Sequence, residues 1–307
     1  MATPLSKGQL FPEQLVPELI NMVRGKSSIA ELCASTPIPF NGLKEFTFSM
    51  DSEIALVGES GKKPASTMSL TPRTIKPVKV VYQSRVTDEF MYASNELRIS
   101  ILQHFIEGYA RKLAKGLDIM AFHGVNPYDG NIAAALANTY FDGTVNTTFE
   151  YLSNGSTPDD NVEDAIAAVQ ANYYEPSGIA MAPVFRKGLA DMRTNNGDRI
   201  YPQLAWGAEQ QSMNGITTKV NMTVPSYPVT VNGNTVTDMA IVGDFQSAFR
   251  WGYSLMPTLE IIEYGDPDGT GNDLKAYNQI MLRSETYLGF TVLDPSAFAR
   301  IIKTATA

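Results

Sequence analysis

Residues 58–64 read GESGKKP and combine two glycines, an acid, a serine and two lysines. Such a stretch can cradle a phosphate, carry a serine nucleophile, or form the tip of a β-hairpin. A phosphate loop requires G-x-x-x-x-G-K-[ST] followed by a helix. Here Leu56 stands at the first glycine position, Lys63 at the Ser/Thr position, and Pro64 leads into an extended segment. Both the residues at the motif positions and the extended segment that follows them argue against a nucleotide-binding loop.

A nucleophile elbow, G-x-S-x-G on a strand-to-helix turn, is also not matched. Lys62 occupies the last glycine position, and no helical pattern follows. We therefore interpret Gly58, Glu59, Gly61, Lys62 and Lys63 as a hairpin tip. The two glycines are expected to permit a tight, partly left-handed turn, and the two lysines then project beyond the strands.

Residues 266–273, DPDGTGND, partly match a calcium-binding loop. Asp266, Asp268, Thr270 and Gly271 are in register, but Tyr277 stands at the twelfth position, where a bidentate glutamate is required. An ordinary Asp/Gly turn is the better interpretation.

Other chemistry is sparsely supported. His104 and His123 are the only histidines and both fall on a predicted helix, so we interpret them as structural. Cys33 is the only cysteine, which excludes an intrachain disulfide and disfavours the usual zinc sites. The sequence therefore predicts no catalytic residue, no metal site and no cofactor.

Composition limits the class of protein. The chain has 307 residues, of which 44% are apolar and 18% charged, enough for one large core or two joined ones. Its 24 basic and 32 acidic residues give a net charge of −8, which argues against a protein whose main activity is to bind the phosphate backbone of nucleic acid tightly. No run approaches roughly eighteen apolar residues and no signal peptide is evident, so we expect a cytosolic chain where it is made.

The first 82 residues lack the pattern of a self-contained domain. Residues 1–40 read as an extended arm because prolines interrupt them repeatedly; these are Pro4, Pro12, Pro17, Pro37 and Pro39. From Phe46 the apolar residues alternate, and alternation resumes after GESGKKP. Residues 46–82 are therefore predicted to form a long, poorly buried hairpin.

Helical periodicity follows. Apolar residues at three- and four-residue steps predict a helix from Ser94 to His123, about 45 Å long and closed by Gly124. A second helix is predicted to start at Thr157, with Pro158 in its first turn, and to be stopped by Pro176 and Gly178.

The remainder reads as mixed structure. GIAMAP, at 178–183, is typical of a buried strand, and 184–192 of a third helix. Residues 216–263 are rich in strand patterns, and 277–293 look like another long strand pair.

The order of these parts resembles the major capsid protein of tailed bacteriophages, which has the Hong Kong 97 type fold. ALVGESGKKPAS is similar to the tip of that family's extended loop, and the segment from VTDEF to MAFHG is similar to its spine helix. IVGDFQSAF, at 241–249, and IMLRSETYLGFTVLDPSAFARI, at 280–301, are similar to its C-terminal strands.

The resemblance implies an α+β fold with an N-terminal arm, an extended β-hairpin loop, a long spine helix, and peripheral and axial domains. The implied divisions are an arm at 1–45, the hairpin loop at 46–84, a peripheral domain with the spine helix at 85–156, a mainly axial domain at 157–276, and a C-terminal return to the peripheral domain at 277–307.

The resemblance also implies a function. The chain would be a structural subunit, not an enzyme, that self-assembles as pentamers and hexamers into an icosahedral shell around a double-stranded DNA genome. Gly58, Glu59, Gly61, Lys62 and Lys63 would lie at a subunit interface. Scaffolding and portal proteins are expected partners, DNA would be enclosed without sequence-specific binding, and no membrane is involved. Assembly is expected in the host cytoplasm, with the chain ending in the virion capsid.

Two alternatives stay open at this point. An encapsulin-type bacterial compartment shares the fold but is expected to carry a cargo-docking N-terminal helix where this chain has a proline-rich arm. A soluble α/β enzyme is disfavoured because the sequence shows no catalytic constellation.

Overall fold

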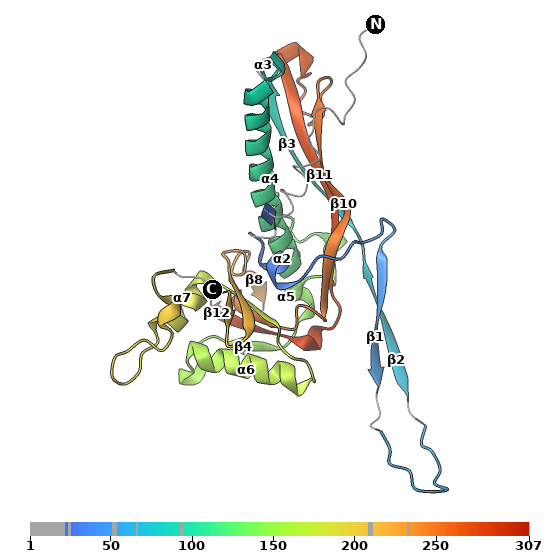
Figure 1. Ribbon diagram of the computed structural model, residues 1–307, viewed down its shortest axis with the longest axis vertical. Coiled ribbons are helices and arrows are strands. Elements are labelled where there is room, and N and C mark those ends of the chain that lie inside the picture. Colours follow the sequence, from blue (N-terminus) through green and yellow to red (C-terminus); the bar gives the residue numbers. More distant parts are fainter. Residues whose placement is uncertain are drawn as a thin grey trace.

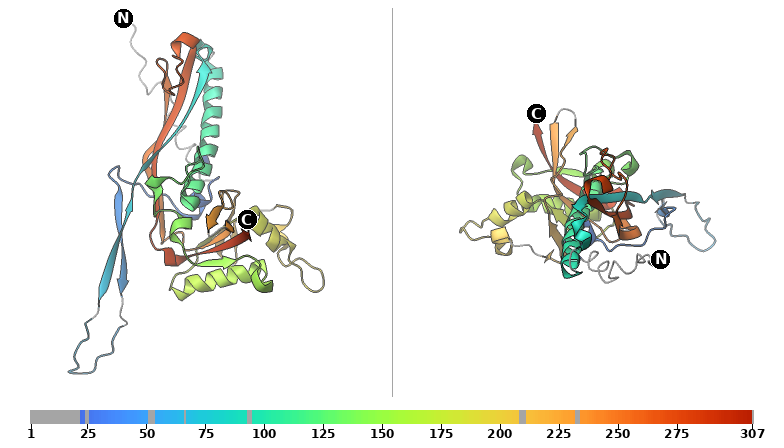
Figure 2. Two further views of the ribbon diagram at one scale, coloured as in Figure 1. Left: turned by 180° about the vertical axis from the view of Figure 1, so that it is seen from behind. Right: turned by 90° about the horizontal axis from the view of Figure 1, so that it is seen from above.

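The structure is a computed structural model. It describes residues 22–23, 26–50, 54–65, 67–92, 95–207, 211–231 and 234–306. Figure 1 shows an elongated upper part, in which a long helix lies along a narrow sheet, a lower part built around a second sheet, and a hairpin that projects to one side. The same separation is visible from behind and from above in Figure 2.

The long helix α4 spans Asn95–His123 and confirms the helix predicted from periodicity. The proposed cap, Ser94, lies outside the described residues. Gly124 ends the helix as predicted, with φ of 65° and its N–H bonded to the carbonyl of Met120 at 2.9 Å. The short helix α3, Glu89–Tyr92, precedes α4 at the upper end of the molecule (Figure 1).

A three-stranded antiparallel sheet runs beside α4. Its order is β10 (Phe249–Ile262), β11 (Gln279–Val292) and β3 (Val78–Thr87). The predicted strand pair at 277–293 is a single strand, β11, with a neighbour on each edge. Its polar residues fit a buried strand because the hydroxyls of Ser284 and Thr286 donate to carbonyls of β10, at 2.7 and 2.8 Å.

The hairpin consists of β1 (Leu43–Met50) and β2 (Met68–Ile75) in antiparallel register, from Leu43 opposite Ile75 to Met50 opposite Met68. The ladder ends at Ile75, short of the predicted residue 82, because Lys76 and Pro77 interrupt the strand and β3 pairs with β11 instead. The hairpin of the structure is therefore shorter at its base than the pattern predicted.

The lower part is a seven-stranded sheet. Its path runs β4 (Thr148–Glu150), β12 (Phe298–Thr306), β9 (Asn234–Gly243), β5 (Gly178–Met181), β7 (Ile216–Val220) and β6 (Ser212–Met213), with β8 (Val229–Val231) also on β9. Residues 277–307 are thus divided between the two sheets, since β11 runs beside α4 and β12 lies here.

Two helices pack in the lower part, α6 (Pro158–Ala171) and α7 (Pro183–Asp191). The predicted start of α6 is confirmed by a capping box between Thr157 and Asp160. The helix ends at Ala171, earlier than the predicted stop at Pro176, because Tyr173 adopts a left-handed conformation with φ of 62°. The predicted buried strand at 178–183 is confirmed by β5.

An aromatic cluster joins the two parts. Phe141, on the short helix α5 (Phe141–Thr144), has its ring centroid 5.0 Å from Phe298, 5.2 Å from Phe249 and 5.6 Å from Phe245. All four are fully buried. Because these residues come from α5, β12, β10 and the β9–β10 turn, the cluster fixes both sheets to each other. Within the described residues, no helix combines the length and apolar character needed to cross a membrane.

Candidate functional site

The hairpin presents an apolar face that the rest of the described chain does not cover. Phe46, Met68 and Leu70 are 52%, 61% and 48% exposed. The register places Phe46 opposite Pro72, two residues from Leu70, so these side chains share one face of the ribbon. A two-stranded hairpin is only marginally stable by itself in water. This face therefore has the properties of a contact surface for another body.

The tip continues this exposure. Ile54 and Leu56 are fully exposed, and Glu59, Lys62 and Lys63 are exposed as well. In the described part of the chain neither Lys62 nor Lys63 forms an ion pair. The tip lies far from both sheets (Figure 1), so it contributes nothing to the chain's own core.

The tight turn expected at the tip is present, but its left-handed residue is Ser60, with φ of 64°, and not a glycine. The N–H of Gly61 donates to the carbonyl of Gly58 at 3.0 Å. Gly61 is needed for space, since a Cβ there would lie 2.7 Å from Val57, whereas a Cβ on Gly58 would meet no atom. The prediction of two conformational glycines was therefore wrong about how the turn is made.

The N-terminal arm is fastened to α4 by a buried carboxylate that sequence reasoning missed. Asp118 Oδ1 accepts hydrogen bonds from the hydroxyl of Ser27 at 2.5 Å and from the N–H of Ile29 at 3.1 Å. Its Oδ2 accepts from the N–H of Ser28 at 2.9 Å and from the hydroxyl of Thr223 at 3.0 Å. These bonds hold the start of α2 (Ser28–Leu32) against the C-terminal end of the long helix.

Burial raises the pKa of Asp118 above its ordinary value, while its hydrogen bonds act in the opposite direction. The side chain is fully buried. A hint was available in the sequence, because Asp118 is the one acid within the apolar run LDIMAF. Its partners, however, come from positions far away in the chain.

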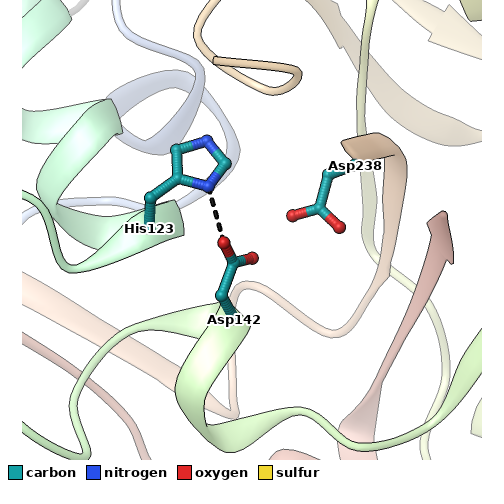
Figure 3. A group of neighbouring side chains, drawn as sticks. All are labelled: His123, Asp142 and Asp238. Carbon is teal, nitrogen blue, oxygen red and sulfur yellow. Dashed lines mark hydrogen bonds and ion pairs between the residues drawn. The ribbon is translucent and has the colours of Figure 1, made fainter. Parts of the chain in front are cut away.

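A second missed cluster lies where α4 ends, shown in Figure 3. His123 Nδ1 lies 2.7 Å from Asp142 Oδ2, and its Nε2 lies 2.9 Å from the carbonyl of Thr223. Because a carboxylate and a carbonyl can only accept, this geometry favours a proton on each ring nitrogen and therefore the cationic imidazole. Burial is the largest single effect and lowers the pKa of His123, but the hydrogen bond to Asp142 and the negative charges of Asp142 and Asp238 together outweigh it, so the pKa is raised.

Arg300 completes the cluster. Its Nη2 lies 2.8 Å from an oxygen of Asp142 and 2.8 Å from Asp238 Oδ1. Burial and the neighbouring Asp142 raise the pKa of Asp238, whereas His123 and Arg300 hold the pKa of Asp142 below its ordinary value against the effect of burial. The residues come from α4, α5, β9 and β12, so this cluster ties the long helix to the seven-stranded sheet.

The same residues can be considered as metal ligands. His123, Asp142 and Asp238 present ligand atoms within 4.8 Å of one another. A metal requires a free lone pair on the histidine, whereas here both ring nitrogens face acceptors. Arg300 already supplies a cation between the two carboxylates. We therefore assign the group to ion pairing that supports the fold.

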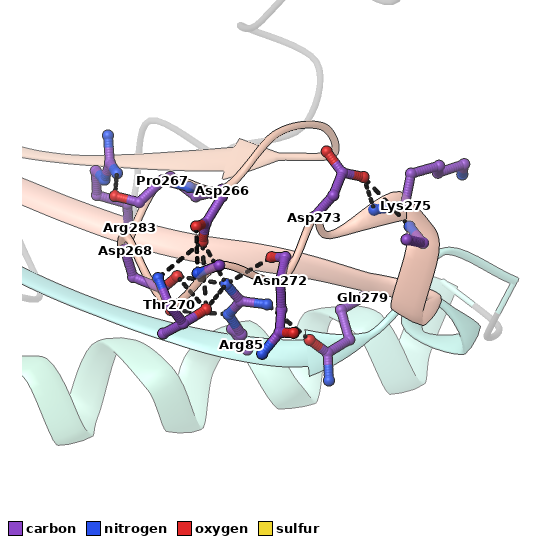
Figure 4. A network of polar contacts seen from close by, with 12 residues as sticks. Arg85, Asp266, Pro267, Asp268, Thr270, Asn272, Asp273, Lys275, Gln279 and Arg283 are labelled. Carbon is purple, nitrogen blue, oxygen red and sulfur yellow. Dashed lines mark hydrogen bonds and ion pairs between the residues drawn. The ribbon is translucent and has the colours of Figure 1, made fainter.

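The calcium-like loop is held by an arginine, as Figure 4 shows. The guanidinium of Arg85, on β3, donates to Asp268 Oδ2 at 2.7 Å, to Asp266 Oδ1 at 2.9 Å and to the hydroxyl of Thr270 at 2.7 Å. Its contact with Asp268 lowers the pKa of that carboxyl. The loop oxygens are thus used by a side-chain cation that clamps the β10–β11 connection onto β3.

The other predicted candidates are not brought together. His104 is exposed on α4, with Nδ1 4.0 Å from Glu107, whereas His123 is buried. Cys33 is buried, and burial raises the pKa of its thiol to about 11. A thiol with a raised pKa is a poor nucleophile.

Comparison with known proteins gives a consistent result. The family model described as the phage capsid family matches residues 7–302. A search of curated proteins found no match.

Solved structures are similar over nearly the whole chain. One from Mycobacterium phage Ogopogo is 30% identical, covers 91% of this chain and 92% of its own, and has a TM-score of 0.78. One from Gordonia phage Cozz is 24% identical, with 99% and 98% covered and a TM-score of 0.73. A structure described as the capsid of an empty GTA particle, computed with C5 symmetry, is 12% identical, with 99% and 95% covered and a TM-score of 0.63.

Proposed function

The chain belongs to the phage capsid family and is a structural subunit of a capsid shell, and we propose that the hairpin of residues 43–75 is the element by which one subunit holds its neighbour. The fold is the Hong Kong 97 type that the order of elements predicted. The observation that carries the proposal is the apolar face formed by Phe46, Met68 and Leu70 on a projecting ribbon. A neighbouring copy of the chain is the body that a shell places beside every such ribbon.

The tip residues extend this contact. Gly58, Glu59, Gly61, Lys62 and Lys63 meet the neighbour beyond the end of the ladder, where the two lysines pair with acidic groups. Support comes from the exposure of the lysines and from their lack of ion pairs within the described residues. The net charge of −8 means that a second copy offers an excess of carboxylates.

The division into domains follows the two sheets. We assign α4 and the three-stranded sheet to the peripheral domain, and the seven-stranded sheet with α6 and α7 to the axial domain near the symmetry axes. The Asp118 contacts with Ser27, Ser28 and Ile29 give the arm, expected at 1–45, a fixed point of departure.

The assembly extends this assignment. Subunits form pentamers and hexamers of an icosahedral shell that encloses double-stranded DNA, with scaffolding and portal proteins as partners and assembly in the host cytoplasm. The similarity to a capsid described with C5 symmetry supports the pentamers. The virion capsid is the final location.

The experiment replaces the apolar face without touching the core. Phe46→Ser with Leu70→Ser should leave the melting of the unassembled chain unchanged, because both side chains are exposed, and should abolish shell formation in light scattering and negative-stain microscopy. Thr47→Ser with Thr71→Ser, on the other face of the same ribbon, is the matched control. Normal shells from the apolar-face variant would refute the proposal.

A further inference from the structure

A pocket of about 430 Å³ opens beside the middle of α4, facing the loop of residues 221–227. Three basic side chains line one part of it and three hydroxyl-bearing residues another: Lys26, Arg111, Lys115, Thr223, Ser226 and Tyr227. Within the described part of the chain its lining includes no acidic side chain. A concentration of positive charge at one place is unexpected in a chain with a net charge of −8.

The basic part is available for a ligand. Arg111 and Lys115 are four residues apart on α4, so they lie one turn apart on the same face, and both are exposed. Arg111 has a loose contact of 3.6 Å with Glu107 at the surface. In the part of the chain that the structure describes, neither Lys26 nor Lys115 forms an ion pair. Among the described residues, two of the three charges therefore have no ionic partner.

The hydroxyl-bearing part is rigid. Thr223 is held by hydrogen bonds to two buried residues. Its hydroxyl donates to Asp118 at 3.0 Å, and its carbonyl lies 2.9 Å from His123 Nε2. The hydroxyl of Ser226 donates to the same carbonyl at 2.6 Å. Tyr227 has a left-handed backbone with φ of 55°, a strained conformation that the surrounding structure must enforce.

The two parts are also joined to each other. The amide of Asn221 donates to the backbone carbonyl of Lys26 at 3.3 Å and to Asp118 at 3.1 Å. The pocket is therefore formed before any ligand arrives, which lowers the cost of ordering it on binding. Buried Asp118 and His123 thus act below the pocket as positioning residues.

We infer that this pocket binds successive phosphate groups of a nucleic-acid backbone, one for each of its three cations, Lys26, Arg111 and Lys115. The inference rests on the proposed function, in which the shell encloses DNA. Arg111 and Lys115 supply charge-assisted donors, and Tyr227 offers a neutral donor to further oxygens. The contact is independent of base sequence because it involves only the sugar-phosphate backbone.

A phosphate fits this pocket better than a carboxylate from a neighbouring subunit. Three cations converge on one cavity, and its volume of about 430 Å³ exceeds what one carboxylate fills. A backbone also presents successive phosphates, which suits two cations one helical turn apart. The rest of the chain is acidic and repels the phosphates outside this pocket. Each subunit is therefore expected to bind the nucleic-acid backbone weakly.

The test measures binding of a short labelled DNA duplex to the full, unassembled chain by fluorescence anisotropy. Three phosphate contacts predict that the logarithm of the binding constant falls with the logarithm of salt concentration with a slope of about −2.7. Arg111→Gln with Lys115→Gln should change the slope to about −0.9 and weaken binding at least about tenfold near 50 mM salt. Lys275→Gln with Lys303→Gln removes the same charge from exposed sites elsewhere and should bind as the wild type does.

The outcomes separate the pocket from its alternatives. Equal slopes for the pocket variant and its control would overturn the inference. So would a pocket variant that binds DNA normally but no longer forms shells in light scattering, because the pocket would then receive an acidic group of a neighbouring subunit. Failure of the wild type to form shells would contradict the proposed function and not the anisotropy result. Circular dichroism confirms that the pocket variant is folded.

Discussion

The hydroxyl of Ser27 donates a hydrogen bond of 2.5 Å to Oδ1 of Asp118, ninety-one residues later in the chain. Both groups are buried, and the backbone N–H groups of Ser28 and Ile29 reach the same carboxylate. These contacts give the described part of the arm a firm point of attachment on its own subunit. This carboxylate provides it, on the helix around which the upper part of the molecule is built.

Asp118→Ala is expected to lower the free energy of unfolding by at least about 3 kcal/mol, because several buried donors lose their acceptor together. Asp118→Asn should cost less, since the amide oxygen still accepts. Chemical denaturation measures both. Asp164→Ala, at an exposed position on α6, is the control and should change stability by less than about 0.5 kcal/mol. Limited proteolysis should cut the arm faster only in the Asp118 variants, and an unaltered arm would contradict the attachment.

His123 predicts a pH dependence of stability. Its pKa in the folded chain is raised above the ordinary value of 6.5, so the folded state keeps a proton that the unfolded state releases. The stabilisation is complete below about pH 6.5 and is lost as the pH rises through the raised folded pKa. Melting temperature should therefore fall as the pH rises from 6.5 toward alkaline values.

His123→Gln removes this dependence and costs about 3 kcal/mol at acidic pH, because Asp142 loses its buried cationic partner. The charged groups that face the imidazole, Asp142, Asp238 and Arg300, remain in the variant, so the difference from wild type isolates the histidine. His104→Gln, at the exposed histidine, is the control and should keep the wild-type slope. Parallel curves for wild type and His123→Gln would show that the imidazole does not titrate in this range.

Two glycines of the long-helix region should respond in opposite directions to the same change. Gly108 lies on the exposed face of α4 and a Cβ there meets no atom, so Gly108→Ala should stabilise the chain by about 0.5–1 kcal/mol. Gly124 has φ of 65° and a Cβ there would lie 2.4 Å from the ring of Tyr140. Gly124→Ala should destabilise by at least about 2 kcal/mol in thermal denaturation. Stabilisation at Gly124 would contradict the observed helix end.

The elements with a long regular pattern could be predicted from the sequence. The apolar spacing of α4 repeats over many turns. The capping residue of α6, Thr157, lies only three residues from its partner Asp160, so the start of that helix is visible in the local sequence. The end of α6 could not, because it is made by a left-handed Tyr173, a residue type that does not signal such a conformation. The shorter hairpin ladder could not either, because β3 pairs with β11, a tertiary contact that overrides the local pattern.

The buried polar clusters were missed for a related reason. Asp118 receives donors from Ser27 and Thr223, and His123 meets Asp142 and the Thr223 carbonyl. No motif links positions so far apart, and a single sequence carries no record of their pairing. The calcium-like loop shows the same limit. Its sequence identifies the oxygen-bearing side chains, but it does not show that they bind Arg85, which lies far away in the sequence.

The hairpin tip leads to the last prediction. Lys62 and Lys63 project from a turn that Ser60 and Gly61 make possible, and both are exposed. Lys62→Glu with Lys63→Glu should leave the melting of the unassembled chain unchanged, because neither lysine contacts the core. Each exposed pair with a neighbour contributes only about 0.2–1 kcal/mol, but the contribution is repeated at every copy in a closed shell. The variant should therefore need a higher protein concentration to form shells, as measured by light scattering.

Salt supplies a second measurement of the same contact. If the pairs are exposed, wild-type assembly should weaken as salt rises, and the double variant should lose that part of the dependence. Lys275→Glu with Lys303→Glu, at exposed positions away from the hairpin, is the control for charge alone. A phosphate-binding tip predicts a different outcome, a rise in melting temperature with nucleotide that the double variant lacks. Calorimetry with and without nucleotide distinguishes the two, and a clear nucleotide effect would show that the tip is a ligand-binding loop and not a structural contact.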